Sequence, residues 1–135
     1  IDLYQSHTIY IQKVYNERTM DLSNKKCIPC EVGGLPLDPE AVAIFSRDLK
    51  EWKVVESNEA YKGSVMKIVL HLKFKDFKES MIFINKVAEI AEGEGHHPDI
   101  KINYNEVTLE LTTHAVGGLT ENDFIVATKI DKIVV

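Results

Sequence analysis

The clearest pattern in the chain is the alternation of apolar and polar positions over residues 66–74, which predicts a half-buried antiparallel strand. A shorter apolar run over residues 52–55 precedes it and is expected to be a brief strand. The same alternation recurs over residues 100–104 and 107–114, which are joined by a tight two-residue connection. Short connections favour hairpins over parallel crossovers, so two antiparallel strand pairs are expected.

Three helices are expected around these strand pairs. Asp38 can accept a backbone N–H bond as an N-cap, and Pro39 suits the first helical position, so a short amphipathic helix is expected to begin there. A last helix is expected to begin near Thr120. The middle helix is expected over residues 77–91, stopped by glycines from Gly93 onward. Its expected apolar stripe consists of Phe77, Met81, Ile84, Ala88 and Ala91.

The resulting order of helix, strand pair, helix, strand pair, helix predicts an α+β fold, a four-stranded antiparallel sheet with helices packed on one face. Residues 27–135 are expected to form this domain and residues 1–26 an N-terminal extension. In the extension, Tyr4, Ile11 and Tyr15 fit one face of a helix, whereas residues 8–11 fit the start of a strand. The pattern does not decide between these two structures. Because the first residue is Ile, we expect a trimmed or processed chain.

Composition and charge exclude several classes of protein. A chain of 135 residues with 44% hydrophobic residues predicts one globular domain, and no apolar run approaches the ~20 residues of a membrane span. Sixteen Lys and Arg against 21 Asp and Glu argue against a nucleic-acid-binding face, although they leave protein binding open. Two cysteines cannot staple a domain of this size, so we expect a cytoplasmic protein. An organelle-targeting segment removed upstream would leave no trace.

Three histidines form the strongest chemical signal. His96, His97 and Pro98 lie between the end of a predicted helix and the start of a strand, and His114 ends the last strand. If the last two strands form a hairpin, His114 lies beside His96 and His97. Imidazoles titrate near 6.5 and can therefore both give and take protons at neutral pH. The alternatives are solvent-exposed histidines and a three-histidine zinc site, but adjacent His96 and His97 cannot easily both aim at one ion.

Other candidate residues have simple structural explanations. The motif Cys27-Ile28-Pro29-Cys30 runs into a Gly-Pro loop rather than a helix, so it is expected to be structural rather than redox-active. A structural zinc site would want a second such pair. With Thr120 as N-cap, Asp123 falls at the third helical position, where a carboxylate favours the helix terminus. Glu92 is consistent with a solvated residue on the last turn of its helix.

The order of these residues resembles the pterin-4a-carbinolamine dehydratases. The resemblance covers about residues 38–134 and departs at Ile100, where many members carry an aromatic residue. It extends to the segment 74–77 that enters the long helix and to the segment 118–120 before the last helix. The family motif is matched by Glu92, His96, His97, Pro98, Tyr104, His114 and Asp123.

The resemblance implies a reaction, the loss of water from a 4a-hydroxytetrahydropterin to give the quinonoid dihydropterin. This recycles the tetrahydrobiopterin used by aromatic amino-acid hydroxylases. One acid and one base on opposite sides of a flat substrate are sufficient, so neither metal nor cofactor is expected. All three histidines are then expected to be catalytic. His96 and His114 would handle the hydroxyl and ring protons, with acid and base not assigned between them, and His97 would orient the substrate.

The resemblance also implies binding residues and partners. Glu92, Pro98 and Asp123 are expected to orient the histidines. Association into homodimers or homotetramers is implied, and some animal members also bind a transcription factor. A protein-binding cofactor of a transcription regulator is therefore one alternative function, and a three-histidine metalloenzyme is another. The expected substrate-binding positions are Gly95, His96, His97, Thr112, Thr113, His114 and Ala115.

Overall fold

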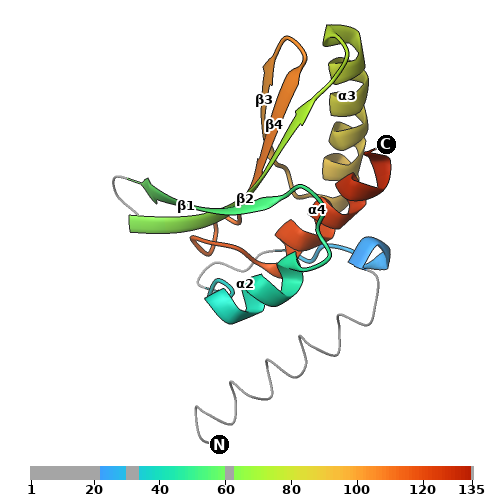
Figure 1. Cartoon of the computed structure of the whole chain (residues 1–135). Helices are drawn as coiled ribbons and strands as arrows, with labels where there is room; N and C mark the ends of the chain where they lie inside the picture. Colours follow the sequence, from blue (N-terminus) through green and yellow to red (C-terminus); the bar gives the residue numbers. More distant parts are fainter. Residues whose placement is uncertain (1–21, 30–33, 60–62, 135) are drawn as a thin grey trace, which may run out of the picture.

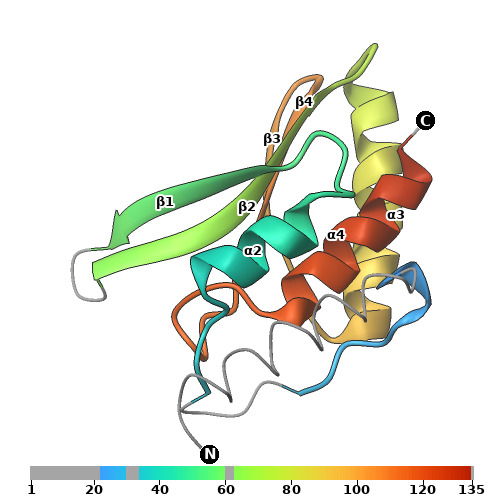
Figure 2. The ribbon, with the colours of Figure 1, turned by 60° about the horizontal axis from the view of Figure 1, so that its bottom comes forward.

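The computed structural model describes residues 22–29, 34–59 and 63–134. Within these ranges, the strands form one antiparallel sheet in the order β1-β2-β4-β3, and helices α2, α3 and α4 pack on one of its faces (Figures 1 and 2). This arrangement confirms the predicted α+β fold and its element order. The elements are η1 (Leu22–Asn24), α2 (Pro39–Ser46), β1 (Lys53–Glu59), β2 (Gly63–Lys73), α3 (Phe77–Glu94), β3 (Asp99–Asn103), β4 (Glu106–Leu111) and α4 (Glu121–Ile133).

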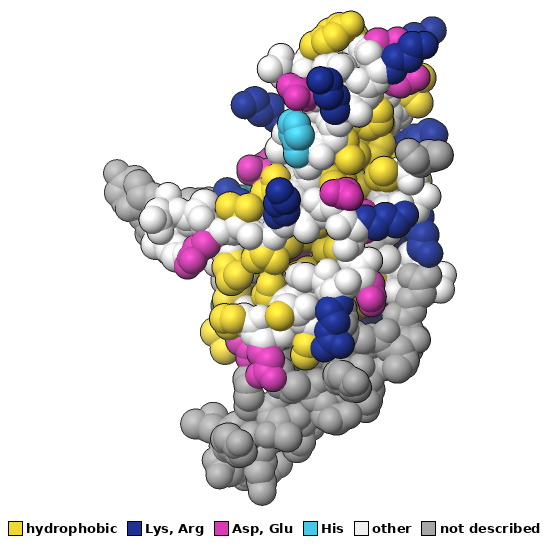
Figure 3. Space-filling model, in the orientation of Figure 1, with side chains coloured by type: hydrophobic (Ala, Val, Ile, Leu, Met, Phe, Trp, Pro, Cys, Tyr) yellow, Lys and Arg dark blue, Asp and Glu magenta, His cyan; other side chains and the backbone are white. Residues whose placement is uncertain are grey.

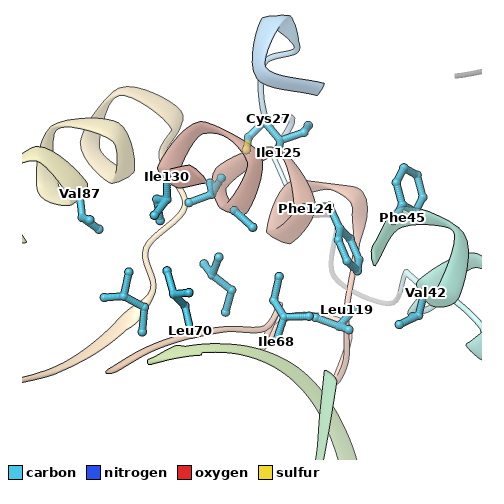
Figure 4. Packing of buried hydrophobic residues seen from close by; sticks show 14 of the residues in the cluster. Cys27, Val42, Phe45, Ile68, Leu70, Val87, Leu119, Phe124, Ile125 and Ile130 are labelled. Carbon is cyan, nitrogen blue, oxygen red and sulfur yellow. The ribbon is translucent and has the colours of Figure 1, made fainter. Parts of the chain in front are cut away.

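The core lies between the two central strands and helix α4. Ile68 and Leu70 of β2 and Leu109 of β4 point to this side and are almost completely buried, as the alternation predicts. Phe124 and Ile130 cover them from α4 (Figure 4). Because each such side chain contributes about 1.5–3 kcal/mol when fully buried, this layer fixes α4 against the sheet. The start of α4 is thereby held next to the end of β4.

The buried face of α3 differs from the predicted stripe. Phe77, the first residue of that stripe, is 51% exposed. Three buried positions, Ser80, Phe83 and Val87, each lie one residue before a predicted one, a rotation of about 100° around the helix, whereas Ala91 is buried as predicted. The helix carries apolar residues on two sides, so periodicity alone does not select one of them. Phe83 contacts the ring of Phe74 at 5.1 Å between centroids, and this tertiary contact selects the inner face. The fully buried positions are Ser80, Phe83, Val87 and Ala91.

Two element ends also differ from the prediction, and both lie near the histidines. Helix α3 continues through Gly93 and ends at Gly95, whose φ of 66° is the left-handed conformation that glycine adopts easily. Strand β4 ends at Leu111 rather than His114. The chain then turns back, and the N–H of Thr113 donates to the carbonyl of Gly118 at 2.8 Å. His96 and His114 therefore both lie in loops that follow these two ends.

Two predicted helix starts are confirmed. The Asp38 side chain accepts a hydrogen bond from the N–H of Ala41 at 2.8 Å, and α4 begins directly after Thr120.

The alternatives for residues 4–15 and the position of Cys30 lie outside the described residues. Among the residues that are described, no helix has both the length and the apolar character that a membrane crossing requires. On the face shown in Figure 3, side chains of both charge signs are interspersed.

Candidate active site

A cavity of about 660 Å³ opens where the C-terminal end of α3, the loop after β4 and the first turn of α4 meet. All three candidate histidines, His96, His97 and His114, line this cavity. The hairpin brings them together, because β3 begins at Asp99 opposite Glu110 of β4 and the loops beyond both residues lie at the same end of the sheet. The predicted binding positions that also line the cavity are Gly95, Thr112, Thr113 and Ala115.

His96 is paired with a buried carboxylate. Its Nε2 lies 2.6 Å from Oδ1 of Asp123, and the side chains are 11% and 0% exposed, respectively. A carboxylate oxygen only accepts hydrogen bonds, so Nε2 of His96 is the nitrogen that carries the proton. The other ring nitrogen, Nδ1, is then unprotonated and is a hydrogen-bond acceptor. A carboxylate in this place fixes both the tautomer and the orientation of an imidazole.

The second oxygen of Asp123 is satisfied by the protein itself. Oδ2 accepts hydrogen bonds from the hydroxyl of Thr113 at 2.8 Å and from the backbone N–H of Thr120 at 2.9 Å. The hydroxyls of Thr113 and Thr120 also lie 2.8 Å apart. The bond to Thr120 belongs to the helix cap, so the two explanations of Asp123 are compatible. One oxygen caps α4, and the other holds His96.

The remaining predicted site residues occupy different surroundings. Nε2 of His97 lies 3.7 Å from Oε2 of Glu92, with side chains 57% and 80% exposed, and contacts this exposed contribute little to stability. Pro98 is buried just before β3. Tyr104, a member of the sequence motif, lies at the β3–β4 turn with a positive φ of 57° and does not line the cavity. His71 lies on the outer face of the sheet, hydrogen-bonded to Thr108 at 2.9 Å.

Sequence reasoning missed one side of the cavity. Residues 26–29, here called the Cys27 arm, line it together with Asn122 and Glu94. Their contacts to α3 and α4 span 67 and 94 positions along the chain. Neither periodicity nor spacing reports a contact of that range, so the C-x-x-C motif was the only signal at this place. Its expected role, structural rather than redox-active, stays a prediction for the pair, since Cys30 lies outside the described residues.

The electrostatics of the arm favour a neutral thiol beside a charged carboxylate. Burial raises the pKa of the Cys27 thiol to about 12, and the negative charge of Glu94 adds to the effect. Burial also raises the pKa of Glu94, but hydrogen bonds from Lys129 and from the N–H of Cys27 outweigh it and leave that pKa below its usual value. A thiol this weakly acidic is a poor nucleophile and a poor metal ligand.

The donor set gives no support to a metal centre. Among the described residues, no three His, Cys, Asp or Glu side chains come together in an arrangement that could hold a metal ion. Nε2 of His96 is already committed to Asp123. The three-histidine metalloenzyme considered from the sequence therefore has no cluster of ligands in this part of the chain.

Comparisons with known proteins agree with the geometry. The family model described as pterin 4 alpha carbinolamine dehydratase matches residues 35–133. A Rickettsia bellii protein provisionally named as such a dehydratase is 45% identical over 114 residues, covering 84% of this chain and 94% of its own. A Legionella pneumophila protein of the same provisional name is 42% identical over 118 residues, covering 87% of this chain and 98% of its own.

A solved structure agrees with these sequence matches. The crystal structure of a transcriptional coactivator/pterin dehydratase from Brucella melitensis superposes with a TM-score of 0.64 at 33% identity. It covers 73% of this chain and 97% of the Brucella chain. The family model covers most of the chain, and the Rickettsia and Legionella relatives match it over more than four fifths of its length. The chain belongs to the pterin-4a-carbinolamine dehydratase family.

Proposed function

We propose that this protein removes water from a 4a-hydroxytetrahydropterin to give the quinonoid dihydropterin. The observation that carries the proposal is the His96–Asp123 pair, which fixes an imidazole in one tautomer at the wall of a cavity that His97 and His114 also line. A cavity of about 660 Å³ lies within the ~300–1,000 Å³ of small-molecule sites. Family membership supports the same reaction.

The chemistry requires two proton transfers. The hydroxyl on the ring carbon leaves as water only after it gains a proton, and the neighbouring ring nitrogen must lose its proton to supply the electron pair. Each positioned acid or base contributes ~10²–10⁴-fold. In this proposal His96 and His114 carry out the two transfers, because both line the cavity and come from different loops.

The buried carboxylate suits His96 to take a proton rather than to give one first. With Nε2–H bonded to Asp123, the free Nδ1 of His96 can accept the ring proton, and the carboxylate stabilises the imidazolium that forms. His114 then protonates the departing hydroxyl. His97, exposed and next to His96, contacts and orients the substrate.

The edge of the pterin requires hydrogen-bonding groups, which the two loops supply. Residues 112–115 follow the end of β4, outside the regular strand, and line the cavity. Gly95 ends α3 on the other side. A flat heterocycle with donors and acceptors along one edge matches such a rim of peptide groups.

Stopped-flow absorbance of a freshly generated 4a-hydroxytetrahydropterin tests the proposal. Dehydration should accelerate in proportion to the protein, with EDTA present, and both His96→Ala and His114→Ala should lose ~10²-fold or more in kcat. His71→Ala is the matched control, since His71 lies on the outer sheet face and outside the cavity. A wild-type rate equal to the spontaneous rate would refute the proposal.

A second function is supported by the name of the Brucella structure, which combines a transcriptional coactivator with a pterin dehydratase. Binding to a transcription regulator would use a surface outside the histidine cavity. Capture of such a partner should then survive the double variant His96→Ala with His114→Ala. Loss of capture in the folded double variant would contradict a separate binding surface.

A further inference from the structure

We propose that the Cys27 arm is a wall of the substrate cavity, on which Ile28 and Pro29 support one face of the flat heterocycle. The proposal deepens the proposed function and rests on it. A pterin presents hydrogen-bonding groups along its edges and a flat face that an aliphatic side chain can cover. Ile28 and Pro29 are the largest aliphatic side chains among the residues that line the cavity.

The arm is attached to the end of α3 that carries His96. The N–H of Cys27 donates to Oε2 of Glu94 at 2.8 Å, and Oε1 of the same carboxylate accepts from the ammonium of Lys129. Glu94 precedes His96 by two residues, and its side chain is only 10% exposed. A hydrogen bond to a partly buried, charge-paired carboxylate is stronger than one between neutral groups, so this attachment is firm.

The arm is also attached to the end of α4 that carries Asp123. The N–H of Ile28 donates to Oδ1 of Asn122 at 3.1 Å, and Nδ2 of Asn122 donates back to the carbonyl of Ile28 at 2.6 Å. Cys27 lies against α4 in the core, with Sγ 3.6 Å from the carbonyl oxygen of Asn122 (Figure 4). The reciprocal amide bonds fix both the position and the direction of the chain at Ile28.

These attachments tie the arm to the two helix ends that carry His96 and Asp123. Glu94 and Asn122 are, respectively, two residues and one residue away from that pair along the chain. In Figure 2 the blue segment after η1 passes the C-terminal end of α3. Any movement of the helix ends would therefore move the wall and His96 together, which keeps the ring face and the proton-transferring group aligned.

Among the described residues, the side chain of Ile28 does not belong to the buried core. It is 73% exposed, whereas its neighbour Cys27 is 8% exposed and belongs to the core. A large apolar side chain whose backbone is fixed at a cavity wall is suited to cover a ligand face, because contact with the ligand would bury its exposed apolar surface. Ile28 is thus a substrate-positioning residue, and Asn122 and Glu94 position it.

The variant Ile28→Ala tests the wall. We expect KM to rise about 10-fold, the lower end for loss of methylene contacts in an apolar pocket, while kcat and its pH profile stay within about twofold. Leu35→Ala is the matched control, because Leu35 is 90% exposed in the same part of the chain and does not line the cavity. Circular dichroism of both variants reports the fold.

A binding measurement separates this proposal from the proposed reaction. The dissociation constant of 7,8-dihydrobiopterin, a stable pterin used here as the probe, should rise about 10-fold in Ile28→Ala and stay unchanged in Leu35→Ala. An inactive wild type that binds the probe would contradict the reaction alone. Equal KM and dissociation constants in wild type and Ile28→Ala, or a wild type that does not bind the probe, would overturn the wall.

Discussion

Replacing Asp123 by Asn keeps the size of the side chain but converts one oxygen into an NH₂ group, which donates hydrogen bonds and cannot accept them. The carboxylate accepts three bonds, one on Oδ1 from His96 and two on Oδ2 from Thr113 and Thr120. If the amide oxygen takes the place of Oδ2, the NH₂ group faces Nε2 of His96 and moves the imidazole proton to Nδ1. If it takes the place of Oδ1, the NH₂ group meets the N–H of Thr120.

Both orientations have a measurable cost. The first leaves His96 in the tautomer that cannot take a proton from the substrate, so kcat should fall by ~10²–10⁴, the contribution of a positioned base. The second places two buried donors against each other. Hydrogen bonds to charged groups contribute about 1.5–3 kcal/mol, so the free energy of unfolding should fall by about 1–3 kcal/mol. The loss of activity therefore exceeds what instability alone explains.

The assay is stopped-flow dehydration across pH 5–9, beside urea unfolding of the same samples. Asp131→Asn is the matched control, because Asp131 is a nearly buried carboxylate of the same helix that accepts bonds from Trp52 at 2.9 Å and Lys50 at 3.1 Å, outside the cavity. It should keep kcat within about twofold, since it holds no imidazole. An Asp123→Asn enzyme with wild-type kcat and an unchanged pH profile would refute the role given to the pair.

Three further predictions concern charges outside the reaction. The pKa of Glu94 is lowered, so its contribution to stability is present above its ordinary pKa and should disappear as pH falls through the lowered value. The free energy of unfolding, measured against pH in wild type and in Glu94→Gln, tests this. The same pH dependence in both proteins would contradict it. Burial raises the pKa of Asp131 despite bonds from Lys50 and Trp52, so its contribution should be complete below its ordinary pKa and be lost as pH rises through the raised value, a fall that Asp131→Asn should remove. The Cys27 thiol, with a pKa of about 12, should react with a thiol reagent at pH 8 only on unfolding. The variant Cys30→Ser leaves Cys27 as the single cysteine, and fast labelling of this variant in its native state would contradict the burial of Cys27.

Local chemistry explains why much of the fold follows from the sequence. A strand with one buried face must alternate, so residues 66–74 identified β2 and placed Ile68 and Leu70 in the core. A helix start needs an acceptor for its free N–H groups, and Asp38 satisfies it within three residues. A hairpin between Asp99 and Glu110 brings its flanking loops to one end, which is why spacing alone brought His96 near His114.

Tertiary contacts decided the rest, because no local pattern contains them. Helix α3 is apolar on two sides, and packing of Phe83 on Phe74 chose the buried one. The hydroxyl of Thr113 reaches Asp123 only because the chain turns back after Leu111, earlier than the alternation indicates. The Cys27 arm joins the cavity through contacts with Glu94 and Asn122 that lie 67 and 94 positions away. Sequence periodicity reports the nearest neighbours of a residue, and the site depends on partners that only the folded chain brings together.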